Sequence, residues 1–454
     1  MTGHIVTGCC ARDESTEHMM NLQSTGKVKM NKMGVAAAIG VVALGGLYVG
    51  ASWFTGQVCD EQQQLQLQLW NRQAGVKAQW QATDSGLWQR DGVLQLTLAP
   101  EWVNQYVPGL SQEPVELFLQ VEQSIQPLYI RGSAQLDLSR GSLASALQQT
   151  NLKTLPHQLA WQVNALSQSF ATQLRIDPWK MQLSEDKVDF ALLKLEASGE
   201  INQQADLQLE WDGLSAGNES HQLIYLAPVR ANLQLQNVDG TWLSPGYRLN
   251  LAGVRYISPQ QSLILQQLEG DGSLQELSGD SAARLNIHFN SKLQSLAVSG
   301  DNANFSIENL ALGLNLLDVD KQGYLNLVQS SGHSNLGQMQ TMAAVQQISI
   351  KGLVLQLDKL SLDYNKSNLQ ANGHVTLAAD PRPLLGIRPL LERLQAQLDL
   401  SAAPELVAQL PNGASLLKPM LSRGYIKQGG DGKLSSQLKL MAGKASANGV
   451  ALPL

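Results

Sequence analysis

The string with the strongest catalytic pattern is GLSAG at residues 213–217, which matches the GxSxG sequence around the nucleophile of many hydrolases. In those enzymes a buried parallel strand precedes the serine and a helix follows it, so that the serine stands on a strained turn. Here an alternating amphipathic strand precedes Ser215, and no helical period follows. We interpret Ser215 as a loop serine. A hydrolase that uses Ser215 with His221 or His157 as base is kept as an alternative.

Other chemical motifs are weaker. The histidines form no HExxH pattern and no pair at metal-ligand spacing, and His288 alternates with apolar residues, which predicts a place on the polar face of a strand. Glu269 and Asp271 lack the ligand spacing of a calcium loop and indicate a solvated turn. Gly432 and Lys433 are not followed by the Ser or Thr of a phosphate-binding loop. We predict no catalytic residues, no metal and no cofactor, hence a protein that is not an enzyme.

Composition narrows the class of protein. Of the 454 residues 43% are hydrophobic and only 15% are charged, and the net charge is -6. A negative chain whose basic residues do not cluster in the main region argues against nucleic-acid binding. Three cysteines cannot form a disulfide framework, and Cys59 is the only one expected beyond the apolar segment described next, so any disulfide there would join two chains.

A transmembrane helix is predicted over residues 33–54, because about 22 residues without a charge span the hydrocarbon core of a bilayer. Three lysines precede this segment, and Asp60 and Glu61 follow it, which places the N-terminus in the cytoplasm by the positive-inside rule. A cleavable signal peptide is the alternative. The apolar run is longer than a typical signal sequence and no A-x-A site closes it, which favours a retained anchor.

Two further expectations concern the N-terminal region. Gly46 and Gly50 form a GxxxG pair, the spacing that lets two membrane helices approach closely, so they are candidate contacts of a homodimer. Residues 1–32 are the predicted cytoplasmic segment. Residues 1–29 have no periodicity, whereas Met30 opens a short basic stretch of the kind that precedes an anchor, so we expect the natural start at Met30.

From residue 57 onward the sequence predicts strands. Apolar and polar residues alternate, as in strands with one buried face. The clearest segments are residues 64–69, 93–98, 115–121, 134–138, 205–211, 231–235, 248–252, 284–289, 306–316, 348–357, 369–377, 396–400 and 434–440. The polar positions are mostly Gln, Asn and Ser, so one face of the sheet is uncharged but able to form hydrogen bonds. The other face is mostly Leu, Ile and Val and must be covered by a second layer, by curling of the sheet or by a ligand.

Turns and a few short helices separate the strands. Turn residues occur at 237–240, 270–272, 372–373, 429–432 and 448–449, and such short connections predict an antiparallel meander. Short helices are expected around residues 143–149, 336–347, 384–395 and 404–421. Pro389 predicts that the third of these is broken. The fold class is therefore mainly β, with a large, extended antiparallel domain over residues 57–454.

Both ends of the chain resemble the YdgA-like family of bacterial inner-membrane proteins of unknown molecular function. The motifs that carry the resemblance are MNK at 30–32, WFTG at 53–56, SGLW at 85–88, RGYIK at 423–427 and NGVALPL at 448–454. The resemblance implies a Gram-negative inner membrane, with the β-rich domain in the periplasm, and it brings no catalytic residues. In architecture alone the chain is also similar to AsmA-like envelope proteins, whose anchored sheets curl into apolar grooves that hold lipid.

Three functions follow from these observations. The first is a non-enzymatic envelope scaffold that interacts with another protein or with a second copy of the chain. The second is binding or transfer of a lipid or other apolar ligand along an open face of the sheet. The third is the hydrolase that would use Ser215.

Overall fold

The chain is represented by a computed structural model that describes residues 55–57, 59–61, 63–106, 113–142, 144, 155–183, 186–218, 222–277, 283–301, 303–330, 335–382, 387–409 and 413–453, all within a compact unit, Ala51–Leu454. The predicted membrane span, with Gly46 and Gly50, lies outside these residues, as does most of the expected helix at 143–149. None of the helices in the described ranges is long and apolar enough to cross a membrane.

Strands make up most of the described chain. The first half of the sheet contains β1 (Val76–Asp84), β2 (Asp91–Leu98), β3 (Val115–Gln126), β4 (Tyr129–Leu136), β5 (His157–Asn164), β6 (Ser169–Ile176), β7 (Trp179–Leu183), β8 (Asp186–Phe190), β9 (Leu193–Glu200), β10 (Gln204–Trp211), β11 (Leu214–Asn218), β12 (Gln222–Leu226) and β13 (Val229–Val238). The second half contains β14 (Thr241–Ile257), β15 (Gln261–Leu277), β16 (Arg284–Gly300), β17 (Ala303–Asp320), β18 (Leu353–Tyr364), β19 (Ser367–Leu377), β20 (Leu394–Ala402), β21 (Lys427–Gln428), β22 (Leu434–Met441), β23 (Lys444–Ala447) and β24 (Val450–Ala451).

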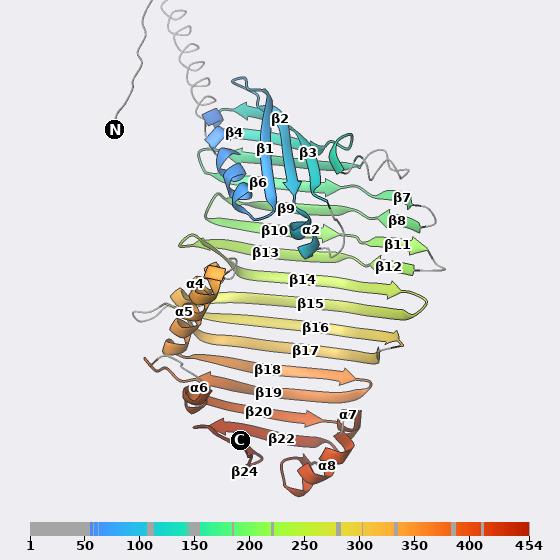
Figure 1. Cartoon of the computed structure of the whole chain (residues 1–454), viewed down its shortest axis with the longest axis vertical. Helices are drawn as coiled ribbons and strands as arrows, with labels where there is room; N and C mark the ends of the chain where they lie inside the picture. The colour runs from blue at the N-terminus through green and yellow to red at the C-terminus, as the bar shows by residue number, and fades with distance from the viewer. Residues whose placement is uncertain are drawn as a thin grey trace, which may run out of the picture. The chain divides into compact units, whose positions relative to one another are not determined.

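These strands form one sheet in which the pairings are antiparallel and follow the order of the chain (Figure 1). From β13 to β20 each strand pairs with the next, so the second half is a plain meander. In the first half β6 pairs with β9, and β10 pairs with β13. Four shorter strands lie next in sequence to these four: β7 follows β6, β8 precedes β9, β11 follows β10 and β12 precedes β13. The shorter strands pair in the order β7, β8, β11 and β12. The predicted antiparallel meander is confirmed.

A line of bends crosses the sheet between these two sets of strands. β6 ends at Ile176 and β7 begins at Trp179, so the apolar residues on either side of the bend are three positions apart. Strict alternation would place them on opposite faces, and one extra residue per strand, as in a β-bulge, keeps them on the same face. The rings confirm this, because Phe190 beyond the bend lies 5.3 Å from Trp211 before it and stacks on Trp179 at 5.2 Å.

The two faces of the sheet differ in chemistry as predicted. On the apolar face, Leu314 of β17 lies between Phe289 of β16 and Leu357 of β18. On the polar face, His288 Nδ1 lies 2.7 Å from Asn315 Oδ1, which confirms the expected side for this histidine. The sheet is thus amphipathic over most of its extent.

Short helices cover only parts of the apolar face (Figure 1). They are α2 (Pro100–Tyr106), α4 (Lys321–Ser330), α5 (Asn335–Lys351), α6 (Ile387–Arg393), α7 (Pro404–Gln409) and α8 (Gly413–Ser422). Together α4 and α5 cover one end of β15–β17, where Leu285, Val319 and Ile348 form a small buried cluster. A helix is present where residues 336–347 predict one, and a pair of helices occupies 404–421. Of the helix expected at 384–395, residues 384–386 lie outside the described part of the chain, Ile387–Arg393 form α6, and residues 394–395 belong to β20. The predicted break was wrong, because Pro389 lies in the first turn of α6, where a missing N–H costs nothing.

Three local expectations were wrong. Residues 64–69 are helical, and residues 348–351 belong to α5, so that β18 begins only at Leu353. The glycines at 270–272 and 373 are inside strands rather than turns. A Cβ on Gly272 would lie 2.3 Å from the ring of Tyr247, and one on Gly373 2.2 Å from the carbonyl oxygen of Gln397. These glycines therefore admit neighbouring atoms on the sheet and do not reverse the chain.

Candidate functional site

The structure places Ser215 and His157, two residues of the proposed hydrolase, on strands that do not pair with each other. Ser215 is inside β11, opposite Asp189 and Tyr225, so the expected loop is wrong and the strained turn is also missing. His157 is on β5, whose partners are β4 and β6, and both of its ring nitrogens are engaged. Its Nε2 accepts from the backbone N–H of Leu136 at 2.6 Å, and its Nδ1 lies 2.8 Å from the carbonyl oxygen of Leu155. His221 lies outside the described residues.

A helix beside the first strands forms the wall of a different site. Residues 55–57, 59–61 and 63–72 are helical, and we name them the N-terminal helix. The Asn71 side chain donates to the carbonyl oxygen of Ala78 at 2.9 Å and accepts from the Ala78 N–H at 2.8 Å, which ties the end of the helix to the edge strand β1. Near its start, Asp60 pairs with Arg90 at 3.1 Å. The helix is therefore held in place at both ends, close to the sheet.

A cavity of about 690 Å³ lies between this helix and the apolar face of the first strands. Side chains without charge line it: Cys59, Gln63, Gln66, Leu67, Trp70, Trp80, Leu94, Leu119, Val121, Gln123, Ile130, Ala134, Leu159, Trp161, Val163, Phe170, Ile201, Asn202, Ala205, Leu235 and Trp242. Its volume is in the range of small-molecule pockets, which are mostly apolar with a few polar groups. A ligand that enters it can bury an apolar group but finds no counter-ion there.

Cys59 lies at one side of this cavity and is not poised to react. Its side chain is buried, and its Sγ lies 3.5 Å from Gln123 Oε1. Burial, and secondarily the charge of Asp60, raises the pKa of the Cys59 thiol to about 11. The thiol is thus protonated at neutral pH, whereas a nucleophilic or metal-binding cysteine needs the thiolate. Cys59 acts here as a small apolar lining residue.

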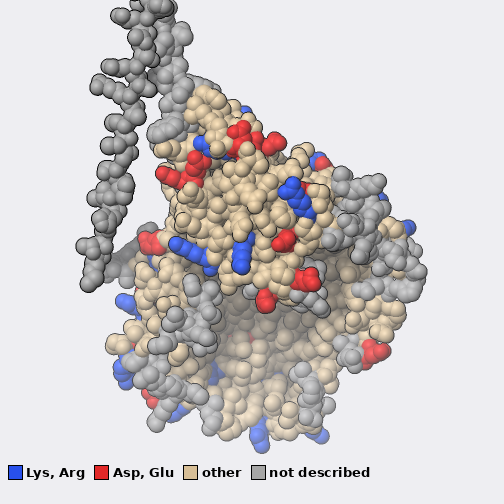
Figure 2. All heavy atoms as spheres, turned by 45° about the horizontal axis from the view of Figure 1, so that its top comes forward, with Lys and Arg blue, Asp and Glu red and all other residues tan. Residues whose placement is uncertain are grey.

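The apolar face continues beyond the cavity across β14–β20. Figure 2 shows this side of the unit hollowed, with a floor almost free of charged side chains and with Lys, Arg, Asp and Glu around it. Large apolar side chains remain partly open to solvent, since Trp242 is 42% exposed, Phe289 37% and Leu355 41%. A second apolar cavity of about 450 Å³ lies at the far end, where Leu406 and Val407 of α7 face the sheet. We name the cavity, this face and the second cavity together the apolar groove.

Sequence reasoning anticipated an apolar face that needs a cover or a ligand, but not the residues of the cavity. One wall of the cavity is the N-terminal helix, for which the alternation of Gln and Leu at 64–69 wrongly predicted a strand. A signal for the helix existed, because Cys59, Gln63, Gln66, Leu67 and Trp70 recur at steps of three and four, the spacing of one helical face. Within the described residues no group of three His, Cys, Asp or Glu could hold a metal ion.

Comparison with known proteins yields one match. The model of a family described as bacterial proteins of unknown function, DUF945, matches residues 30–454 of this chain. No curated protein and no solved structure gives a significant match.

Proposed function

Since this chain belongs to DUF945, a family of bacterial proteins of unknown function, we propose its function from the geometry of the groove: it binds the apolar part of an amphiphilic ligand, such as the acyl chain of a lipid. The observation that carries the proposal is an uncharged cavity of about 690 Å³ that opens onto a leucine-rich face left half-exposed. Burying an acyl chain there is favourable by roughly 25 cal/mol for each Å² removed from water.

The chemistry of the lining selects the part of the ligand that enters. No charged side chain among the described residues lines the cavity, and an unpaired charge in an apolar site costs several kcal/mol of desolvation, on the order of the values for buried ions. A charged headgroup therefore stays outside the cavity, in water. The bound group is a hydrocarbon chain, and the protein holds it without altering it chemically.

The predicted anchor supplies the setting of this proposal. In it, residues 33–54 hold the chain in the inner membrane with the N-terminus in the cytoplasm, and the sheet lies in the periplasm. The resemblance of both ends of the chain to YdgA-like proteins supports this arrangement, and the likeness to AsmA-like proteins is in architecture only. An amphiphile extracted from the bilayer would then be the nearest source of acyl chains.

Protein interaction is the second candidate. The exposed fractions of Phe289 and Leu355 on the open stretch of the groove suit a partner chain or a second copy of this chain as well as a ligand. A homodimer that forms through Gly46 and Gly50 would be compatible with either. The two candidates differ in what fills the groove after purification.

The test uses the full chain in an amphipol and a fluorescent fatty acid as the acyl-chain probe. We expect saturable binding, together with phospholipid or fatty acid recovered by organic extraction and seen by native mass spectrometry. Ala134→Trp fills the cavity from the sheet, and Gln66→Glu adds a charge to the cavity lining from the N-terminal helix. Both should weaken probe binding at least tenfold, whereas Ala297→Trp, an exposed position on the polar face, should not.

Two results would count against the ligand. One is a chain that neither carries lipid nor binds the probe, and the other is equal binding by the folded Gln66→Glu and Ala297→Trp variants. A ligand-free chain whose mass rises to a dimer with concentration would favour the interaction candidate instead.

A further inference from the structure

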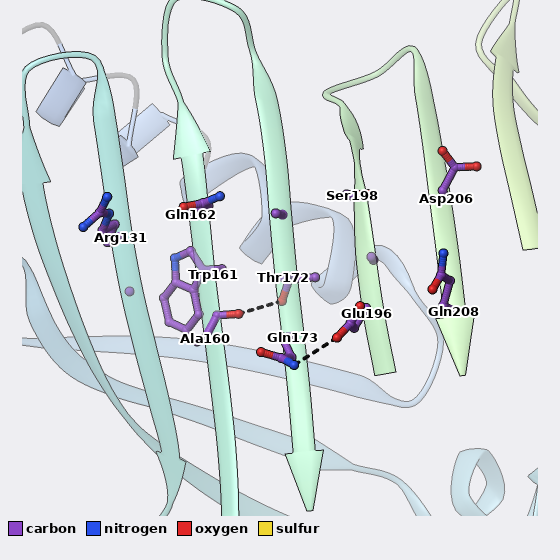
Figure 3. A pocket seen from close by; sticks show the side chains of 13 residues that line it. Arg131, Ala160, Trp161, Gln162, Thr172, Gln173, Glu196, Ser198, Asp206 and Gln208 are labelled. Carbon is purple, nitrogen blue, oxygen red and sulfur yellow. Dashed lines mark hydrogen bonds between the residues drawn. The ribbon is translucent and has the colours of Figure 1, made fainter. Parts of the chain in front are cut away.

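A second depression lies on the polar face of the sheet, across β4, β5, β6, β9 and β10 (Figure 3). Its volume is about 510 Å³. The pairings explain its shape, because small side chains meet in its middle: Ala160 on β5, Ala171 on β6 and Ser198 on β9. Longer polar side chains surround them, so the depression has a low floor and a raised polar rim.

The rim consists of two rows that follow the sheet register. Arg131 pairs with Gln162, and further along the same row Ser198 pairs with Asp206. In the second row Gln173 pairs with Glu196 and Glu196 with Gln208. Four strand spacings of about 4.8 Å separate the first row's ends, so Arg131 and Asp206 lie roughly 19 Å apart along it. This length suits an extended ligand better than a single small ion.

Two groups of polar side chains elsewhere on this face satisfy one another. Asn315 donates to Asp358 at 2.5 Å, and both Gln397 and Gln437 donate to Asp399, at 3.1 and 2.8 Å. These rows of amides and carboxylates leave few groups available for another molecule.

In the depression most rim groups lack such partners. Gln173 donates to Glu196 at 3.0 Å, as Figure 3 shows. The side chains of Arg131, Gln162, Asp206 and Gln208 form no hydrogen bond or ion pair with any other residue that the structure describes. Arg131 offers hydrogen-bond donors at one end of the depression, and Asp206 offers acceptors at the other. The glutamine amides can do both, and the low floor leaves room for a ligand ring.

From this arrangement we infer that the depression is a binding site for a polyhydroxylated ligand, namely a linear oligosaccharide. A hydroxyl group both donates and accepts, so it can satisfy an amide, a carboxylate or a guanidinium in turn. Each sugar ring repeats its hydroxyls along the ligand, just as each strand repeats a polar side chain across the sheet. Arg131 stands at one end of the first row and Asp206 at the other, so a single small ion cannot satisfy the whole row.

This site lies on the opposite face of the same strands from the apolar groove, and Trp161 lines both. Within β5, Gln162 faces the depression, whereas Leu159 and Val163 line the cavity on the other side. One ligand class can therefore be present without the other, and the two can be tested separately.

The experiment measures binding of cellotetraose, maltotetraose and chitotetraose to the full chain in an amphipol by isothermal titration calorimetry. We expect at least one of them to bind with a submillimolar Kd. Ser198→Trp raises the floor with a bulky ring and should weaken that binding at least tenfold. Gln162→Leu removes a rim amide that would form hydrogen bonds with the ligand, and it should weaken binding severalfold. Ala297→Trp is the matched control on the same face and should bind as the unmodified chain does.

The inference fails if none of the three oligosaccharides binds at millimolar concentration. It also fails if Ser198→Trp and Gln162→Leu bind as tightly as Ala297→Trp while their thermal unfolding is unchanged. The fatty-acid probe should bind Ser198→Trp normally, so failure here leaves the proposal for the apolar groove intact.

Discussion

Cys59 shows how one side chain reports on the cavity. At the ordinary thiol pKa of 9.0, about a tenth of a cysteine is thiolate at pH 8, but with the pKa raised to about 11 roughly a thousandth is. We expect Cys59 of the folded chain to react with a thiol reagent about a hundredfold more slowly at pH 8 than in urea, with a rate that climbs until pH 11. The reagent is an aromatic disulfide, and the protein is the Cys9→Ser, Cys10→Ser variant. The measurement follows the absorbance of the aromatic thiolate that the reaction with Cys59 releases.

The same experiment checks the ligand from a second direction. An acyl chain in the cavity would cover Cys59 and slow the reaction further. If the folded chain reacts at pH 8 as fast as the chain in urea, Cys59 is exposed to solvent and does not line a closed cavity wall.

Single residues were the hardest level to predict. Ser215 matched a catalytic pattern and proved to be a strand residue, because the pattern specifies residue types and leaves the preceding and following elements open. Gly272 looked like a turn residue and proved to make room for Tyr247 on the neighbouring strand. Both misreadings have one cause: a residue's role depends on its cross-strand partner, which the local sequence does not contain.

Among the elements, the line of bends constrains the backbone closely at Gly213. Gly213 has φ +114° there, and a Cβ on it would lie 2.2 Å from the carbonyl oxygen of Leu226. Gly213→Ala should therefore destabilise the chain by about 2–4 kcal/mol, from an unfavourable φ and a backbone clash together. Urea unfolding followed by tryptophan fluorescence measures the effect.

Gly240→Ala is the matched control for this substitution. Gly240 has φ +81° in a turn, and a Cβ there would meet nothing within 4 Å, so only the φ cost of about 1 kcal/mol applies. If both variants unfold at the same urea concentration, close packing at the bend does not constrain the sheet.

Most strands could be predicted from alternation alone, because one half-buried face imposes a period of two. The prediction of a strand at 64–69 was wrong for a physical reason. Leu65 and Leu69 are 41% and 42% exposed, and of the three leucines only Leu67 lines the cavity. Alternation of Gln and Leu therefore does not reflect burial in this segment. The bends were also visible as three-residue steps between apolar residues, such as Ile176 to Trp179. Their alignment into one line depends on the register of many strands.

For the molecule as a whole, the open groove implies a thermodynamic signature. Unfolding exposes less new apolar surface when one face of the sheet is already half-exposed, and the heat capacity change scales with that surface. We expect a heat capacity change of unfolding below the usual value of about 12–15 cal/mol/K per residue. Differential scanning calorimetry of the full chain in an amphipol measures it. A value within or above that range would mean that the groove is closed in solution.

At this scale the sequence predicted an amphipathic antiparallel sheet whose apolar face is covered by a second layer, by curling of the sheet or by a ligand. The structure shows that helices cover part of this face and leave the rest open. The outcome depends on how far the sheet curls, which many small bulges determine together. The anchor at 33–54 and the periplasmic location stay predictions.

The order of the strands has a consequence for how such a chain acquires its structure. Because nearly every strand pairs with its neighbour in sequence, contacts close short loops, and the sheet has no step that requires its two ends to meet. Folding can begin at one hairpin and advance by one strand at a time, as in repeat proteins whose units contact only their neighbours. A chain delivered N-terminus first could therefore fold as it emerges, each new strand docking on an edge that is already complete.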